Sequence, residues 1–383
     1  MLEELLYPEA IERLQRDLQN AITDWDYLSG ISGEGPIAEF EAEFAKLNGS
    51  EYAIALTNAT SALFVSLIAS GIGKGDEVIL PSYTWPQTLT PVILTGATPV
   101  FADIDSDTVT ISPKSVEKLI TRKTRAVIAV HLYGIPADVL QLDKIARDNG
   151  CILIYDSAQG FGAHFNNKPI GAYGNYVAYS LGRSKLFSVG EGGVLICRNR
   201  KLYERAIAFS QHPLRMHRDI DDTDLRMSID GVSMNFRLHP LIASLALGQL
   251  KALIKYGKLK QLQARFKEVY ERIKSTEAGC ILPEIPVGAS PSGICIPLIP
   301  KKKNDLLKIR GVLENLGLDT FDGGLKKPLH LTETIKRHRF IFHPNSRKFV
   351  IPPHKTHRHG ICPNTESRSR DGKRVFIKMM IGL

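Results

Sequence analysis

The chain has 383 residues, of which 43% are hydrophobic and 23% charged, a composition typical of a globular protein long enough for two domains. No apolar run approaches the roughly 20 residues needed to span a bilayer, and the acidic N-terminus lacks the features of a signal peptide. Five scattered cysteines without a CxxC pair indicate reduced thiols in a cytoplasmic protein and argue against a metal site.

The net charge of +9 is unevenly distributed along the chain. Lysine and arginine greatly outnumber aspartate and glutamate from Lys326 onward, and this stretch also holds six of the eleven histidines. One interpretation is an electrostatic site for an anionic ligand, and the other is a solvated basic surface. No helix-turn-helix, zinc-finger or aromatic RNA-binding signature accompanies the charge, so we expect no nucleic-acid partner.

Short apolar strands alternate with helices through the first 250 residues, a pattern typical of a mainly parallel sheet covered on both faces. We therefore expect a three-layer α/β domain. Pro36 and Pro113 suit the first turns of two helices, and Gly49 suits a helix end. The expected strands are 52–56, 77–81, 98–104, 125–134, 151–156, 175–181 and 192–199, and the expected helices are 1–22, 36–48, 60–70, 82–96, 112–120, 138–150 and 239–257.

A boundary near residue 252 divides the expected fold into two domains. The large domain, 1–252, includes the N-terminal helical segment, and the smaller domain, 253–383, is of α+β type. Helices at 259–275 and 304–317 and a strand at 292–300 are expected in the smaller domain. From about residue 322 the periodic pattern gives way to an irregular basic segment, in which no element is assigned.

The lysine and glycines around Lys185 raise the question of a phosphate loop. Such a loop requires GxxxxGK[ST], in which the glycines precede the lysine. Here Gly182 is the only glycine shortly before Lys185, and the run Gly190–Gly193 follows it. The pattern therefore argues against nucleotide hydrolysis.

Polar residues at strand ends, where sites gather in open α/β sheets, fit pyridoxal phosphate better. This cofactor needs a lysine for a Schiff base, a carboxylate for its ring nitrogen, a phosphate cradle and often an aromatic ring. Lys185, Asp156 and Trp85 supply the lysine, the carboxylate and the ring. Each residue alone suits an ordinary turn, cap or surface position, but the combination favours the cofactor. Candidate hydroxyls for the phosphate belong to Thr60, Ser61 and Ser180.

Seven segments resemble, in order, those of the DegT–StrS family of pyridoxal-phosphate-dependent sugar aminotransferases. Among them are IYDSAQGFGA, with an Asp-x-x-Gln pair, SLGRSKLFSVGEGG, with lysine five residues after serine, and NFRLHPLIASLALGQL. The resemblance is strong over residues 30–252 and moderate to about 330. It implies the aspartate-aminotransferase fold (fold type I) and a homodimer with shared active sites.

The resemblance also implies a role for each candidate residue. Lys185 would form the Schiff base, Asp156 would pair with the pyridinium nitrogen, and Gln159 would contact the cofactor's phenolic oxygen. Trp85 would stack on the ring. The phosphate would be held by Ala59, Thr60, Ser61, Ser180 and, from the partner protomer, Asn235.

The reaction implied by the resemblance is a ping-pong transamination. Glutamate or glutamine would donate the amino group, pyridoxamine phosphate would carry it, and a nucleotide-linked keto sugar would accept it. A keto-cyclitol or another carbonyl metabolite as acceptor stays open, as does a non-catalytic pyridoxal-phosphate-binding regulatory protein. A sugar dehydratase is disfavoured because such relatives have histidine in place of Lys185. The chain departs from the family at Leu181–Gly182, Arg183 and Gly160–Phe161, where we expect a reshaped acceptor pocket.

Overall fold

The computed structural model describes most of the chain up to residue 323 and several short pieces beyond it. The described ranges are 6–227, 232–276, 280–300, 305–318, 320–323, 325, 328–332, 335, 362–365 and 374–378. Most of the basic segment expected from about residue 322 therefore lies outside the described residues.

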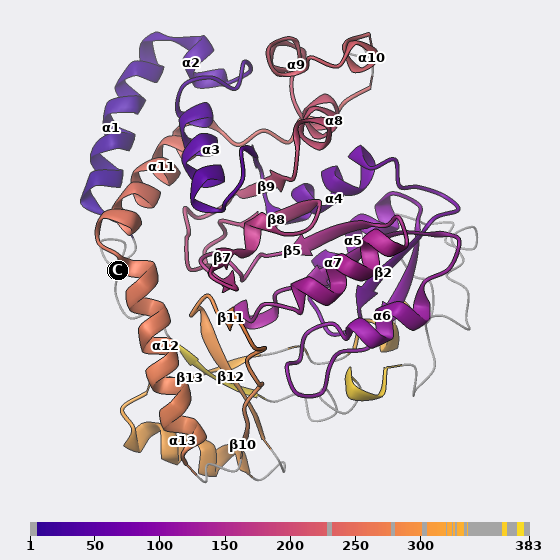
Figure 1. Cartoon of the computed structure of the whole chain (residues 1–383). Coiled ribbons are helices and arrows are strands. Elements are labelled where there is room, and N and C mark those ends of the chain that lie inside the picture. The colour runs from indigo at the N-terminus through magenta and orange to yellow at the C-terminus, as the bar shows by residue number, and fades with distance from the viewer. Residues whose placement is uncertain are drawn as a thin grey trace.

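A seven-stranded sheet forms the centre of the fold (Figure 1). Its strand order is β1-β9-β8-β5-β4-β2-β3, in which β3, β2, β4, β5 and β8 run parallel and β9 is antiparallel to both of its neighbours. The predicted mainly parallel sheet is thus confirmed. The strands are β1 (Tyr52–Leu56), β2 (Glu77–Pro81), β3 (Thr98–Ala102), β4 (Thr124–Val130), β5 (Ile152–Asp156), β8 (Tyr176–Ser180) and β9 (Gly193–Cys197).

Helices cover both faces of this sheet. Because side chains alternate across a strand, neighbouring residues such as Ile154 and Tyr155 join two different buried clusters. The cluster of Ile154 also contains residues of the helices α4 (Ala59–Ala69), α5 (Pro86–Leu94), α8 (Arg200–Ser210) and α9 (Pro213–Asp219). The cluster of Tyr155 contains residues of α3 (Pro36–Leu47), α6 (Pro113–Leu119), α7 (Val139–Asp148) and α11 (Pro240–Lys255). The predicted three layers are therefore present.

The N-terminal helix lies against α11 on the outside of the large domain (Figure 1). This helix, α1 (Pro8–Thr23), starts later than the expected helix at 1–22 and is followed by α2 (Trp25–Ser29). A Cβ at Gly248 would lie 2.6 Å from the Cα of Ala10, so glycine allows the two helices to approach closely. The short helix α10 (Thr223–Arg226) follows α9.

A smaller antiparallel sheet lies at the far end of α12 (Lys258–Lys274), as Figure 1 shows. Phe266 and Ile273 of α12 pack with Leu298 and Val375 of this sheet and with Leu313 in one buried cluster. This arrangement agrees with the expected α+β type, whereas the boundary near residue 252 stays a prediction. The elements are β10 (Cys280–Ile281), β12 (Cys295–Pro300), β13 (Thr320–Gly323), β14 (Arg374–Lys378) and α13 (Asp305–Asn315).

The strand expected at 125–134 ends earlier than predicted. β4 stops at Val130, and the next residues form the 3₁₀ turn η1 (Leu132–Gly134), in which Tyr133 has a positive φ of 59°. Leu132 and Tyr133 are buried, so their apolar character reflects packing in the core rather than strand pairing. The remaining short elements are β6 (His164–Phe165), β7 (Lys168–Pro169), β11 (Ala289–Ser290), η2 (Ile170–Ala172) and η3 (Leu329–Leu331).

Candidate active site

A cavity of about 780 Å³ lies at the carboxyl ends of β4, β5 and β8, beside the first residues of α4 and α5. This is the edge at which open α/β sheets bind their ligands. Seven of the nine site residues predicted from the sequence line the cavity: Ala59, Thr60, Trp85, Asp156, Gln159, Ser180 and Lys185. The fold therefore brings together residues that are more than 120 positions apart in the chain.

Asp156 ends β5 and is 7% exposed. Its Oδ2 accepts a hydrogen bond from the Thr88 hydroxyl at 2.8 Å, and its Oδ1 accepts one from the Ala158 amide at 3.1 Å. Burial raises the pKa of Asp156, and these two donors and the charge of Lys185 oppose the rise. Thr88 was not among the predicted site residues, and its contact with Asp156 joins positions 68 apart in the chain.

Lys185 lies in the loop after β8, with its backbone amide donating to the carbonyl of Gly182 at 2.9 Å. Burial lowers the pKa of its amine, whereas the negative charge of Asp156 opposes that change. The residues that follow, Leu186 and Phe187, are buried, so the loop is anchored immediately after the lysine. Lys185 is itself partly buried, and a lysine whose pKa is lowered can act as a nucleophile near neutral pH.

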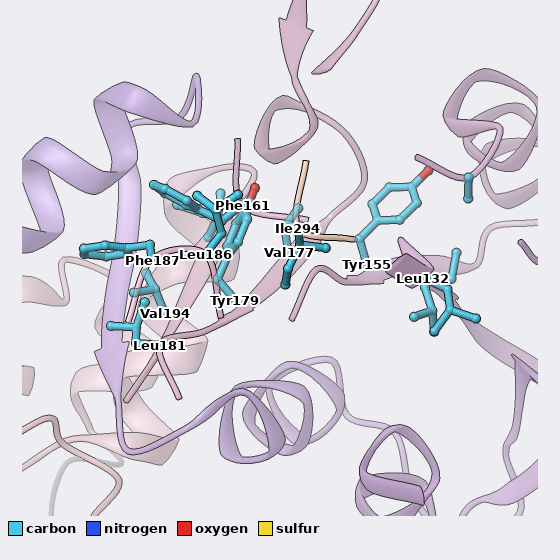
Figure 2. Close-up of a cluster of buried hydrophobic side chains, with 14 of the residues drawn as sticks. Leu132, Tyr155, Phe161, Val177, Tyr179, Leu181, Leu186, Phe187, Val194 and Ile294 are labelled. Atoms are coloured by element: carbon cyan, nitrogen blue, oxygen red, sulfur yellow. The ribbon is translucent and has the colours of Figure 1, made fainter. Parts of the chain in front are cut away.

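An apolar layer lies behind the lysine loop, the segment 181–192 between β8 and β9 that carries Lys185. Figure 2 shows Leu181, Leu186 and Phe187 from this loop near Phe161 and Tyr179. The rings of Phe161 and Phe187 have centroids 5.0 Å apart. Two of the residues that depart from the family pattern, Phe161 and Leu181, are thus packed in the core.

Of the other departures, Gly160 does not line the cavity, whereas the two in the loop of Lys185 do. Gly182 and Arg183 both line it, and Arg183 is exposed. No ion pair involves Arg183 within the part of the chain that the structure describes. Among the departures from the family pattern, Arg183 is therefore the one that adds a charged side chain to the cavity lining.

The N-terminus of α4 borders the cavity and is closed by a capping box. Asn58 Oδ1 accepts from the amide of Ser61 at 2.8 Å, and Ser61 Oγ accepts from the amide of Asn58 at 3.2 Å. Ser61 does not line the cavity, and its hydroxyl also donates to the Asn58 carbonyl. Its role as a phosphate ligand stays a prediction. The first-turn amides of Ala59 and Thr60 have no intrahelical acceptor, which suits an anion.

A glycine fits the backbone of β9 closely against this helix start. A Cβ at Gly193 would lie 2.3 Å from the carbonyl carbon of Asn58 and 2.7 Å from the amide nitrogen of Ala59. Ser180, the partner of Gly193 across the sheet, also lines the cavity. The glycine thus allows the Ser180 hydroxyl and the start of α4 to border the same space.

Gln159 and Trp85 lie on other walls of the cavity. The Oε1 of Gln159 accepts from the amide of Tyr133 at 2.6 Å, which fixes the side-chain amide. Trp85 is the N-cap of α5 and is 49% exposed, so its indole ring is available to a ligand.

Asn235 is exposed and does not line the cavity of its own chain. The carbonyl of the next residue, Phe236, accepts from the amide of Thr57 at 2.9 Å. This bond holds the segment that carries Asn235 beside the start of α4. The predicted contact of Asn235 with a partner's cofactor stays a prediction.

The described part of the chain contains no group of three or more His, Cys, Asp or Glu residues able to hold a metal ion. It also contains no helix that is both long and apolar enough to cross a membrane. None of the five cysteines forms a disulfide within the described residues, and four of them are buried.

Two solved structures show the class of protein to which this fold belongs, the aminotransferases of fold type I. DesV from S. venezuelae is 28% identical and has a TM-score of 0.73, with 97% of this chain and 89% of that chain covered. A DegT DnrJ EryC1 StrS aminotransferase from Brucella abortus is 25% identical with a TM-score of 0.73, over 96% and 90% of the two chains. The predicted fold, the aspartate-aminotransferase type, is therefore confirmed.

The chain belongs to the DegT/DnrJ/EryC1/StrS aminotransferase family, whose model matches residues 15–285. It is 33% identical over 246 residues to the GDP-perosamine synthase of Escherichia coli O157:H7, covering 64% of this chain and 65% of the relative. It is 33% identical over 250 residues to the spore coat polysaccharide biosynthesis protein SpsC of Bacillus subtilis, covering 64% of both. The matches thus span slightly less than two thirds of these relatives.

Proposed function

We propose that this protein is a pyridoxal-phosphate-dependent aminotransferase that moves an amino group from glutamate or glutamine to a nucleotide-linked keto sugar. The observation that carries the proposal is that Lys185 and Asp156 line one cavity, together with the aromatic ring of Trp85. The family and the nucleotide-sugar relative support the choice of reaction and acceptor.

The residues around the cavity fit pyridoxal phosphate. The free amides of Ala59 and Thr60 and the hydroxyl of Ser180 suit its phosphate. Asp156 is a buried carboxylate that would gain a charge partner from the ring nitrogen, which would oppose the effect of burial on its pKa. Trp85 would cover the ring.

The chemistry is divided between the cofactor and Lys185. Pyridoxal phosphate, when bound, supplies the carbonyl carbon that takes up the amino group and a ring that accepts negative charge. Lys185 would hold the cofactor covalently through Nζ. When a substrate amine displaces it, the freed Nζ would take a proton from the substrate carbon. Burial lowers the pKa of Lys185, which increases the fraction of neutral amine available for both tasks.

Arg183 supports an acceptor with negative charge. Arg183 is two residues from Lys185 in the chain and lines the same cavity. Guanidinium groups bind phosphate oxygens through paired hydrogen bonds. A diphosphate linked to a sugar would therefore find a cation at the cavity edge, whereas a neutral keto-cyclitol would not use it.

We also propose a homodimer in which Asn235 of one protomer completes the partner's site. The exposed position of Asn235 beside the start of α4 leaves its side chain free of the cavity in its own protomer. An exposed amide next to a phosphate-binding turn is suitably located to reach across an interface.

The first experiment tests the cofactor and its attachment. The purified protein is mixed with pyridoxal phosphate, reduced with borohydride, digested and mapped by mass spectrometry, and we expect the adduct on Lys185. Lys185→Ala should lose the adduct, and Lys144→Ala, which changes an exposed lysine in α7, should retain it. An adduct spread over several surface lysines would contradict the proposal.

The second experiment tests the reaction. Protein loaded with pyridoxamine phosphate is mixed with nucleotide-linked keto sugars, free keto sugars and keto-cyclitols, and the return of the visible cofactor band is recorded. We expect the nucleotide-linked compounds to react fastest. A preference for keto-cyclitols would show that the acceptor is a keto-cyclitol and not a nucleotide-linked sugar. If neither glutamate nor glutamine bleaches the band and no acceptor restores it, the protein is a cofactor-binding regulator rather than an aminotransferase.

A further inference from the structure

Two buried threonines lie behind the carboxylate of Asp156. The Thr88 hydroxyl donates to Oδ2 of Asp156 at 2.8 Å, and the hydroxyl oxygens of Thr84 and Thr88 are 2.9 Å apart. Thr88 is 0% exposed and Thr84 is 2% exposed, so bulk water does not compete for these bonds. The two threonines flank Trp85 in the sequence and hold the start of α5.

The direction of these bonds follows from the number of hydrogens. A hydroxyl has a single hydrogen, and Thr88 gives its hydrogen to Asp156. Thr84 must therefore donate to Thr88, and the chain of bonds ends on the carboxylate. Bonds linked in this way polarise one another. With the Ala158 amide on Oδ1, each oxygen of the carboxylate receives one neutral donor.

Among the described residues, the charged group that acts on Asp156 is Lys185. Its charge lowers the pKa of Asp156 and so opposes the effect of burial. This effect is smaller than those of the hydrogen bonds from Thr88 and the Ala158 amide. In the proposed reaction Lys185 changes its bonding, whereas the threonines and the amide do not. They are therefore the constant support of the carboxylate.

We propose that Thr88, supported by Thr84, is a positioning residue that holds the Asp156 carboxylate ionised and in one orientation for the cofactor's ring nitrogen. It acts through Asp156 and does not itself touch the substrate. Because Trp85 lies between the two threonines, the same bonds also hold the backbone that carries the residue expected to cover the ring. The inference rests on the proposed function for the cofactor, but its first test does not use the cofactor.

The first test uses the full chain without cofactor. Thr88→Val keeps the shape and removes the hydroxyl, and Thr88→Ser keeps the hydroxyl. Without its donor Asp156 is harder to ionise, so Thr88→Val should lower the melting temperature more at pH 7 than in mildly acidic solution. Thr88→Ser should lack this pH dependence. So should Thr90→Val, a control on the same helix whose hydroxyl bonds only a backbone carbonyl.

Asp156→Asn tests whether the effect of Thr88→Val acts through the charge of the Asp156 carboxylate. In a background with Asp156→Asn, the penalty of Thr88→Val should no longer vary with pH, because no charge remains to be supported. A penalty that varies equally in both backgrounds, or that is the same at all pH values, would mean that Thr88 only packs. Equal effects of Thr88→Val and Thr88→Ser would likewise overturn the inference.

The second test uses the protein with pyridoxal phosphate. Thr88→Val should weaken cofactor binding about 10- to 100-fold, the equivalent of one hydrogen bond to a charged group, and shift the pH midpoint of the visible band. Thr88→Ser should restore both, and kcat should fall more than KM rises. If wild-type protein binds no cofactor, the proposed function fails, whereas the melting experiment still decides whether Thr88 supports the charge of Asp156.

Discussion

Arg215 and Glu41 form a bidentate ion pair in the interior of the protein. The two terminal nitrogens of Arg215 lie 3.0 and 2.7 Å from the two carboxylate oxygens of Glu41, and Arg215 is 1% exposed. Oε1 of Glu41 also accepts from the amide of Ala55 at 2.7 Å. The pair therefore joins α9 to α3 and to β1, the strand that leads into the turn before α4.

Removing one member of this pair should be costly because it leaves a buried charge without its partner. We expect Arg215→Ala to lower the free energy of unfolding by about 3–5 kcal/mol, measured by urea denaturation. Arg147→Ala, which breaks an ion pair on the surface of α7, should cost less than about 1 kcal/mol. Equal, small effects of the two changes would show that the buried pair does not hold the fold together.

Asp156→Asn should stabilise the protein without cofactor near neutral pH. Burial raises the folded-state pKa of Asp156 above its unfolded value, so its contribution to stability is lost as the pH rises through the folded pKa. The gain in melting temperature should be present at pH 7 and shrink as acid protonates the wild-type carboxyl. Asp107→Asn, which changes an exposed carboxylate, is the control. A gain in melting temperature that does not vary with pH would contradict the expected loss of stability on ionisation of Asp156.

Gly193→Ala should impair the phosphate cradle proposed at the start of α4. The added methyl would lie 2.3 Å from the backbone of Asn58, which cannot move as a flexible side-chain end does. We expect a loss of about 1–3 kcal/mol in stability and a weaker affinity for pyridoxal phosphate, measured by equilibrium dialysis. At Gly73 a Cβ would make only an ordinary contact at 3.6 Å, so Gly73→Ala should bind the cofactor normally.

Arg183→Gln should raise KM for a nucleotide-linked acceptor by about ten-fold or more, while KM for the amino donor changes less. The expected loss is that of one charge-assisted hydrogen bond. Initial rates at varied acceptor concentration measure it. Arg122→Gln changes an exposed arginine before β4, at the opposite end of the strands, and should have no effect. An unchanged KM in Arg183→Gln would remove Arg183 from the acceptor site.

Two inactive variants should complement each other if the sites are shared. A heterodimer of Lys185→Ala and Asn235→Ala chains contains one site with both changes and one site with neither. Co-expression should therefore restore activity that each variant lacks alone, and gel filtration should give the mass of a dimer. If Asn235 acts within its own chain, every site keeps one change and no activity returns.

Much of the fold was predictable because the signals were local. Alternating apolar strands and helices indicated the sheet and its layers, and Pro36 and Pro113 marked helix starts that the structure confirms. The strand expected at 125–134 was wrong at its end, because Leu132 and Tyr133 are apolar for packing and not for pairing. Apolar character alone does not distinguish these two causes.

The candidate site was predictable for a different reason. Asp156 and Ser180 end strands, and the carboxyl ends of parallel strands share one edge of a sheet, so residue type and strand order were sufficient. Ser61 illustrates the limit, since its hydroxyl could serve either an anion or a helix cap. In the structure this hydroxyl takes part in the capping box with Asn58, and its role as a phosphate ligand stays a prediction.

The sequence by itself determined the family, the order of the elements and the candidate lysine and carboxylate, because each depends on residue type and spacing along the chain. Only the tertiary structure decided which groups act on them. Thr88 lies 68 positions from Asp156, and Glu41 lies 174 positions from Arg215. Such contacts form where helices and strands pack, and burial then sets the pKa of each group, so neither can be read from neighbours in the sequence.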